Sequence, residues 1–245
     1  FYFMLVKYFN TRKPGWLYIA AIVFAIGFLN KYNIAFLLIG VFPAILITEH
    51  RRIFSEKHFY GAVFLGILLI APNLAWPIRH DFPVFRHLKE LAATQLVFVN
   101  RYDFLKEQLL YFNGAIVVIL AGLFALLRYQ PFRKYILFFP ALVFTLIVFT
   151  YFKAKSYYAI GLYPVYIAFG AVYLENILQT GWKKYLRGPI LFMPVLLFIP
   201  FYGIIFPNKS PEYISENPKP YQKFGLLRWE DGKDHILPQD FADML

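Results

Sequence analysis

A pair of lysines and a pair of tyrosines follow one another in the stretch "FTYFKAKSYYAIGLYPVYIAFG". Lys153 and Lys155 fall in a short break between two apolar segments, and Tyr157 and Tyr158 come directly after them. A lysine near a membrane surface attracts an anionic headgroup by about 1 kcal/mol. The break also runs into the start of the next predicted helix, where free backbone N–H groups favour an anion. We therefore predict a site for a lipid-linked phosphate; the alternative is that the lysines only snorkel to the interface.

A second polar group interrupts the apolar sequence much earlier. In "LNKYN", Lys31 stands alone in a very short turn, with Tyr32 after it and an asparagine on either side. Polar groups clustered at membrane depth are costly and therefore tend to be functional. We assign Lys31 to the phosphate site and Tyr32 to a substrate cavity, while a simple turn remains the other interpretation.

A third polar stretch, "APNLAWPIRHDFPVFRH", follows an apolar helix. Asn73 lies near the end of that helix, where its amide needs a partner, and we place it with His80 and His87 in the possible substrate cavity. Arg86 is a further candidate for the phosphate. His87 and Glu90 have a helical i, i+3 spacing that could hold a divalent metal, but this spacing is too common to be specific, so we expect no metal to be required.

These groups must be positioned by membrane helices. The chain is 60% hydrophobic and only 16% charged, and its apolar residues fall in blocks near the roughly 20 residues that cross a bilayer. We predict an all-α polytopic membrane protein with about eight transmembrane helices. The predicted blocks are Phe1–Phe9, Trp16–Leu29, Ile34–Thr48, Phe59–Trp76, Leu109–Leu127, Tyr135–Phe152, Tyr157–Leu178 and Ile190–Phe206.

Basic residues predict the orientation of these helices. Alternate connections carry three Lys or Arg each, which marks them as cytoplasmic by the positive-inside rule. These residues are Lys7, Arg12, Lys13; Arg51, Arg52, Lys57; Arg128, Arg133, Lys134; and Lys183, Lys184, Arg187. Lys31, Lys153 and Lys155 then face the outside. The net charge of +11 is explained by this distribution, so we expect no nucleic-acid partner.

Two outer segments differ from simple loops. The loop Pro77–Gln108 contains apolar residues at three- and four-residue spacing (Phe85, Leu88, Leu91 or Ala92, and Leu96), which predicts a helix lying in the membrane interface. Residues 207–245 are rich in proline and charge and predict an extracytoplasmic segment leading into a soluble domain, of which "PQDFADML" is a candidate first helix. We expect residues 1–206 to be a membrane domain that lacks its N-terminal part, in an internal fragment of a longer protein.

Several kinds of chemistry have no residues to carry them. The chain has no cysteine, which excludes a disulfide framework, a thiol nucleophile and cysteine-bound metal. No nucleophile motif, Walker sequence or glycine-rich dinucleotide turn is present. A sugar transferase needs a carboxylate to activate its acceptor, and no convincing one occurs here.

Three motifs in order carry a family resemblance. "AIGFLNKYN", "APNLAWPIRHDFP" and "FKAKSYYAIGLYPVYIAFGAVYLE" resemble landmarks of bacterial members of the dolichyl-phosphate-mannose–protein mannosyltransferase family, which share the GT-C membrane fold and are related to the lipid A aminoarabinose transferase. The third motif is the most specific, with Lys155, Tyr158, Tyr163 and Pro164 at matching places. The landmarks extend from about Gly27 to Glu175.

The resemblance implies a glycosyltransferase that takes a hexose or pentose from a polyprenyl-phosphate donor. Its acceptor would be a protein, lipid A or another glycan, and its active site would face the periplasm or exterior from the bacterial inner membrane among membrane lipids. Lys153 and Lys155 would neutralise the leaving phosphate and Tyr158 would orient it, without a required metal. The family's catalytic Asp, or Asp-Glu pair, would lie upstream of Phe1, so no catalytic residue is named here.

Two other functions use the same residues differently. A transporter or flippase would bind a lipid-linked anion without chemistry, although transporters bind substrate near the midplane and these charges gather at one face. A structural membrane subunit would tolerate loss of the charge, so a fully active Lys155→Gln variant would favour it.

Overall fold

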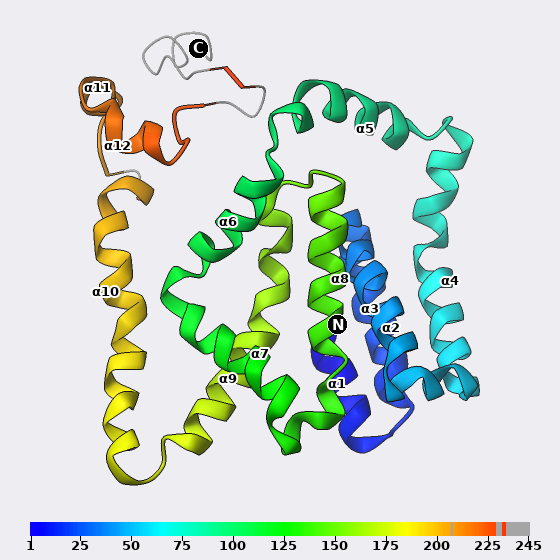
Figure 1. Ribbon diagram of the computed structural model, residues 1–245. Coiled ribbons are helices and arrows are strands. Elements are labelled where there is room, and N and C mark those ends of the chain that lie inside the picture. Colours follow the sequence, from blue (N-terminus) through cyan, green and yellow to red (C-terminus); the bar gives the residue numbers. More distant parts are fainter. Residues whose placement is uncertain (207, 229–231, 234–245) are drawn as a thin grey trace.

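The protein is helical along its length in a computed structural model, which describes residues 1–206, 208–228 and 232–233 (Figure 1). The α-helices are α1 (Tyr2–Thr11), α2 (Gly15–Asn30), α3 (Ala35–Ile47), α4 (Lys57–Arg79), α5 (Pro83–Thr94), α6 (Arg101–Tyr111), α7 (Ile116–Arg128), α8 (Phe138–Tyr151), α9 (Tyr163–Ile177), α10 (Arg187–Ile205), α11 (Pro211–Glu216) and α12 (Pro218–Lys223). Short 3-10 segments join them: η1 (Tyr32–Ile34), η2 (Glu49–Ser55), η3 (Leu96–Phe98), η4 (Asn113–Ala115), η5 (Gln130–Tyr135), η6 (Ser156–Leu162) and η7 (Gly181–Leu186).

The all-α membrane architecture is confirmed, but eight is too many spans. Among the described residues three helical stretches are long and apolar enough to cross a membrane: Lys57–Arg79, Ser156–Ile177 and Gly181–Ile205. Two bent pairs raise the number to five if each pair is one span, Tyr32–Ile47 with Glu49–Ser55 and Arg101–Tyr111 with Asn113–Arg128. The helices α2 and α8 are apolar but shorter, and α1 has 10 residues. Each predicted block does contain a helix; bends and short lengths reduce the number of complete spans.

The predicted helix Leu109–Leu127 shows such a bend. The chain turns by 64° between α6 and the stretch beginning at Asn113, where two weak helix formers, Asn113 and Gly114, are adjacent. A Cβ on Gly114 would lie 2.7 Å from the Cα of Pro194 in α10, so the bend also depends on a small residue. In contrast, α4 continues past its predicted end at Pro77 and stops at Arg79, as membrane helices often tolerate proline.

Small residues bring the central helices close together. A Cβ on Gly170 of α9 would overlap the backbone of Val118 in α7, and one on Gly40 of α3 would meet Thr145 and the carbonyl of Ala141 in α8. Close packing at small residues is the usual way in which membrane helices associate. The helices α7 and α9, and likewise α3 and α8, therefore pack in close contact.

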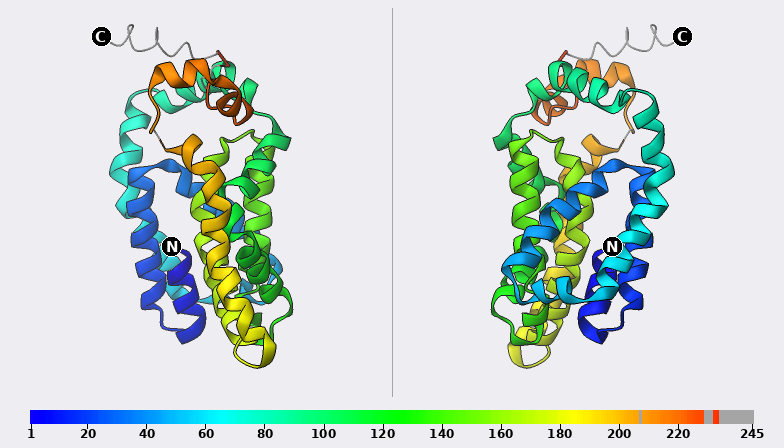
Figure 2. Two further views of the ribbon diagram at one scale, coloured as in Figure 1. Left: turned by 90° about the vertical axis from the view of Figure 1, so that its left-hand side faces the viewer. Right: turned by 90° about the vertical axis from the view of Figure 1, so that its right-hand side faces the viewer.

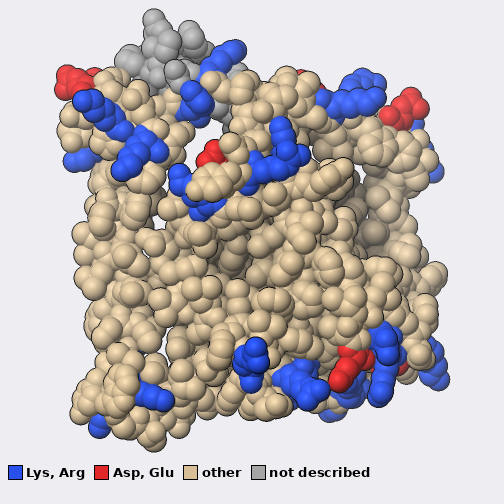
Figure 3. Space-filling model, in the orientation of Figure 1, with Lys and Arg blue, Asp and Glu red and all other residues tan. Residues whose placement is uncertain are grey.

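The connections lie at two opposite ends of the bundle. The links α1–α2, α3–α4, α7–α8 and α9–α10 are at the lower end in Figure 1. The links α2–α3, α4–α5, α5–α6 and α8–α9 are at the upper end in Figures 1 and 2, where α5 lies across the bundle, and the bend between α6 and α7 lies between the two ends. Lys and Arg gather at these two ends and leave an apolar belt between them (Figure 3). The connections that are alternately rich and poor in basic residues along the sequence therefore lie alternately at the two ends of the bundle.

The outer segments are helical in part. A helix forms at Pro83–Thr94 as predicted, with Phe85 58% and Leu88 48% exposed, whereas Leu96 falls beyond its end in η3. Its placement in a membrane interface stays a prediction. After α10, the chain forms α11 and α12; the predicted helix "PQDFADML" lies outside the described residues.

Candidate functional site

The lysine pair lies in a tight turn between α8 and η6. Lys153 has a left-handed backbone with φ of 52°, which costs a residue other than glycine about 1–3 kcal/mol. Its N–H donates to the Thr150 carbonyl, and the Ala154 N–H donates to the Phe149 carbonyl at 2.8 Å. Both bonds cap the end of α8, so the turn has a defined shape. The half-buried Lys153 ammonium has no hydrogen bond or ion pair with any other part of the chain that the structure describes.

Two of the predicted polar groups meet in space. The Lys31 Nζ lies 4.8 Å from the ring centroid of Tyr158 and 5.5 Å from that of Tyr157. The two rings are themselves 4.7 Å apart and nearly perpendicular, at 80°. Cation–π contacts of this kind contribute about 0.5–1 kcal/mol each where exposed. We name Lys31, Lys155, Tyr157 and Tyr158 the lysine–tyrosine cluster.

Lys155 joins this cluster from the other side. Its Nζ donates to Gln95 Oε1 at 2.7 Å, and its charge, like that of Lys31, acts on the Tyr158 hydroxyl. Gln95 follows α5, so this bond ties the long upper loop to the turn after α8. The Lys155 ammonium therefore lies in the lysine–tyrosine cluster with at least one of its donors held by Gln95.

The position of the turn is fixed by α6. Gln108, only 5% exposed, donates through Nε2 to the Ser156 carbonyl at 3.1 Å and accepts from the Tyr163 hydroxyl at 3.2 Å. The hydroxyls of Tyr111 and Ser156 lie 3.0 Å apart. One buried amide therefore links α6, η6 and the start of α9 directly beside Lys155.

A guanidinium closes the other side of the same turn. Arg101, at the start of α6, donates from Nε to the Thr150 carbonyl at 3.2 Å and from Nη2 to the Tyr151 carbonyl at 3.3 Å. These carbonyls lie at the C-terminal end of α8, where a cation is favoured. Arg101, Gln95 and Gln108 were not among the predicted site residues, because nothing in local spacing relates them to a turn about fifty residues away.

The predicted cavity residues form a separate set of contacts. Tyr32 donates to Asn73 Oδ1 at 2.8 Å, which supplies the partner that the Asn73 amide needs. His80 stacks on Trp76, with centroids 4.4 Å apart, and its Nδ1 lies 2.8 Å from the Trp76 carbonyl. His80 is thus held by its own helix, whereas Tyr32 and Asn73 join the η1 turn to α4 next to Lys31.

Arg86 and His87 are not joined to the cluster. Both are exposed on α5 and make no hydrogen bond, ion pair or ring contact with the rest of the described chain. No three His, Cys, Asp or Glu side chains come together as a metal site within the described ranges. The His87–Glu90 spacing therefore gains no third ligand there, and the roles assigned to Arg86 and His87 stay predictions.

One comparison with known proteins finds a match to a family model. Residues 1–76 match the family model of dolichyl-phosphate-mannose-protein mannosyltransferase; no curated protein and no solved structure matches the chain. The matched segment includes Lys31, Tyr32 and Asn73 and ends well before the turn that carries Lys155. It covers the first landmark and the start of the second, so the third landmark depends on the residues alone. Over residues 1–76 the chain is therefore similar to the dolichyl-phosphate-mannose-protein mannosyltransferase family.

Proposed function

We propose that this chain belongs to a membrane glycosyltransferase that moves a sugar from a polyprenyl-phosphate donor to an acceptor. The family match supports this class of enzyme. The observation that carries the proposal is the lysine–tyrosine cluster, in which Lys31 from the matched segment meets Tyr157 and Tyr158 from outside it. Such a cluster at the rim of the apolar belt suits a lipid whose phosphate lies at the interface and whose tail lies in the bilayer.

The chemistry gives the cluster a specific task. Transfer breaks the bond between the anomeric carbon and the phosphate oxygen, and the bonding electrons leave with the phosphate while the acceptor oxygen bonds to the carbon. The donor diester carries one negative charge and the released monoester can carry two. Cations positioned beforehand beside this growing charge lower the barrier. We assign this role to Lys31 and Lys155, with Lys153 in the same turn as Lys155 and Tyr158 orienting the phosphate.

The acceptor must also lose a proton. The family resemblance would place the base that takes this proton upstream of Phe1. We assign the acceptor to the protein, lipid A or glycan class and leave the reaction without a required metal. The short connections with three Lys or Arg each lie at the end opposite the lysine–tyrosine cluster, which favours a periplasmic or exterior active site in a bacterial inner membrane.

A transfer assay tests the proposal. The complete protein, reconstituted in proteoliposomes, is given polyprenyl-phosphate-linked radiolabelled mannose and a membrane extract as acceptor source. Removing both cations with Lys31→Gln and Lys155→Gln should lose about 2 kcal/mol of phosphate stabilisation, or about thirtyfold in rate. The control pair Lys183→Gln and Lys184→Gln removes two charges from the opposite end and should leave the rate unchanged. Equal rates for both double variants would refute the proposal, and donor movement across the bilayer without transfer would favour a flippase.

A further inference from the structure

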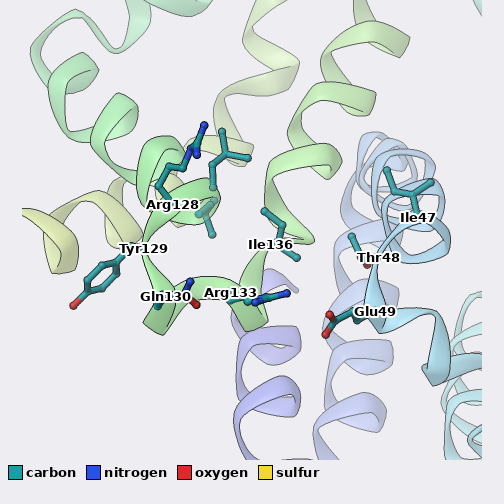
Figure 4. Close-up of a pocket in the computed structure, with 10 residues that line it drawn as sticks. Ile47, Thr48, Glu49, Arg128, Tyr129, Gln130, Arg133 and Ile136 are labelled. Carbon is teal, nitrogen blue, oxygen red and sulfur yellow. The ribbon is translucent and has the colours of Figure 1, made fainter.

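A polar cavity lies at the end of the bundle opposite the lysine–tyrosine cluster. It has a volume of about 440 Å³ and lies between the last residues of α3, the start of η2, the end of α7 and η5 (Figure 4). The sequence explains its arginines only as determinants of orientation. We name it the Arg128–Glu49 cavity after two residues that line it.

Its two sides carry opposite charge. Arg128 and Arg133 line the side formed by α7 and η5, and Glu49 lines the side formed by α3 and η2, as Figure 4 shows. Neither guanidinium makes a hydrogen bond, an ion pair or a ring contact with any residue that the structure describes, so Glu49 does not neutralise them directly. The end of the α3 helix adds partial negative charge on the Glu49 side.

This pattern disfavours a simple anion. The negative ends of α3 and α7 and the Glu49 carboxylate together offset the two guanidiniums, so the cavity has little net charge but a strong separation of charge. The partial negative charge at the end of α7 has a positive partner in Arg128, which lies in the last turn of this helix. Arg133 lies in η5, beyond the end of α7. A ligand that carries one charge of each sign fits both sides.

The walls next to the bilayer indicate a lipid. Ile47 and Leu127 line the cavity and are 66% and 50% exposed. They lie at the C-terminal ends of α3 and α7, at the edge between the apolar residues of these helices and the charged residues that follow them. An acyl chain lying against this edge would leave its headgroup at the level of the arginines.

We propose that the Arg128–Glu49 cavity binds the zwitterionic headgroup of an aminophospholipid. The phosphate lies against Arg128 and Arg133, because guanidinium matches phosphate oxygens in geometry. The primary ammonium lies on the Glu49 side, where it can donate hydrogen bonds to the carboxylate. A choline headgroup has the same charges but no N–H donor, and a glycerol headgroup has no cation. The cavity should therefore prefer phosphatidylethanolamine to phosphatidylcholine and phosphatidylglycerol.

Native mass spectrometry of the complete, delipidated protein tests this preference. We expect phosphatidylethanolamine to be retained about tenfold more strongly than phosphatidylcholine or phosphatidylglycerol, equivalent to one charge-assisted hydrogen bond. Arg128→Gln should weaken retention of phosphatidylethanolamine by about the same factor. Glu49→Gln should remove the preference over phosphatidylcholine while retaining phosphate binding. Lys183→Gln, which removes an exposed charge at the same end without lining the cavity, should change nothing.

Three results would overturn the proposal. Preferential retention of phosphatidylglycerol by the unchanged protein would show a plain anion site. Phosphatidylethanolamine binding unaffected by both Arg128→Gln and Glu49→Gln, in variants with an unchanged thermal midpoint, would place the lipid elsewhere. Equal binding of soluble glycerophosphoethanolamine would identify a water-soluble ligand in place of a lipid. Because each readout is binding, the outcome is independent of sugar transfer.

Discussion

The buried amide of Gln108 offers the sharpest test of how the candidate site is held. Replacement by leucine keeps most of the side-chain volume but removes the bonds to the Ser156 carbonyl and the Tyr163 hydroxyl. The Tyr163 side chain is 6% exposed, so its hydroxyl would lose its acceptor without access to water. Each unsatisfied buried group costs about 1–3 kcal/mol. Since Ser156 is half-buried and can be hydrated, we expect Gln108→Leu to lower the free energy of unfolding by about 2–3 kcal/mol.

A double-mutant cycle separates this bond from a general loss of packing. Tyr163→Phe removes the hydroxyl and should cost about 1 kcal/mol alone. In the double variant the hydroxyl is already absent when the amide is lost. The double variant should therefore lose less stability than the sum of the two single variants, by about 0.6–1.7 kcal/mol, the average and the largest coupling for polar pairs between membrane helices. The assay is reversible unfolding in mixed detergent micelles, followed by tryptophan fluorescence. Tyr135→Phe, whose hydroxyl donates to Asn10 at the other end of the bundle, is the matched control and should be additive with Gln108→Leu. Additivity in both cycles would refute the role given to Gln108.

Other contacts allow shorter tests. Arg101→Ala should destabilise the protein by about 1–2 kcal/mol, because two charge-assisted bonds are lost, and Arg101→Lys should recover only part of this loss. Equal stability of the unchanged protein and both variants would contradict the role given to Arg101. Gly170→Ala should lower stability in thermal unfolding by about 1–3 kcal/mol or more, since its Cβ has no space. Gly203→Ala, with nothing within 4 Å of its Cβ, should be neutral, and a neutral Gly170→Ala would show that α7 and α9 lie further apart. Tyr158→Leu should weaken polyprenyl-phosphate binding more than Tyr158→Phe, because it removes the ring that holds Lys31 as well as the hydroxyl that orients the phosphate; equal effects would assign the role to the hydroxyl alone.

The helices and their alternation could be predicted from the sequence, for a physical reason. Apolar blocks and basic connections are local properties, and each predicted block contains a helix. The bend near Gly114 depends on Pro194 of a distant helix, which no local pattern reveals. The number of complete spans was overestimated for this reason.

The candidate site was predictable in its parts but not in its contacts. Lys31 and Lys155 stand out because cations are rare in short outer turns, and both were assigned to one end of the bundle. The amide partner of Lys155, Gln95, is sixty residues away and has no recognisable spacing to it. Conversely, Arg86 stood out by charge density alone, and the structure leaves it exposed and without contact to the cluster.

The most direct test of the central claim compares two lipids that differ only by a phosphate. Binding of radiolabelled undecaprenyl phosphate and of undecaprenol to the complete protein is measured in detergent micelles. The unchanged protein should prefer the phosphate by more than about tenfold, as expected for two cations. This preference should be lost in the Lys31→Gln, Lys155→Gln double variant and kept in the Lys183→Gln, Lys184→Gln control. A preference retained in the first double variant would show that the lysine–tyrosine cluster does not hold the phosphate.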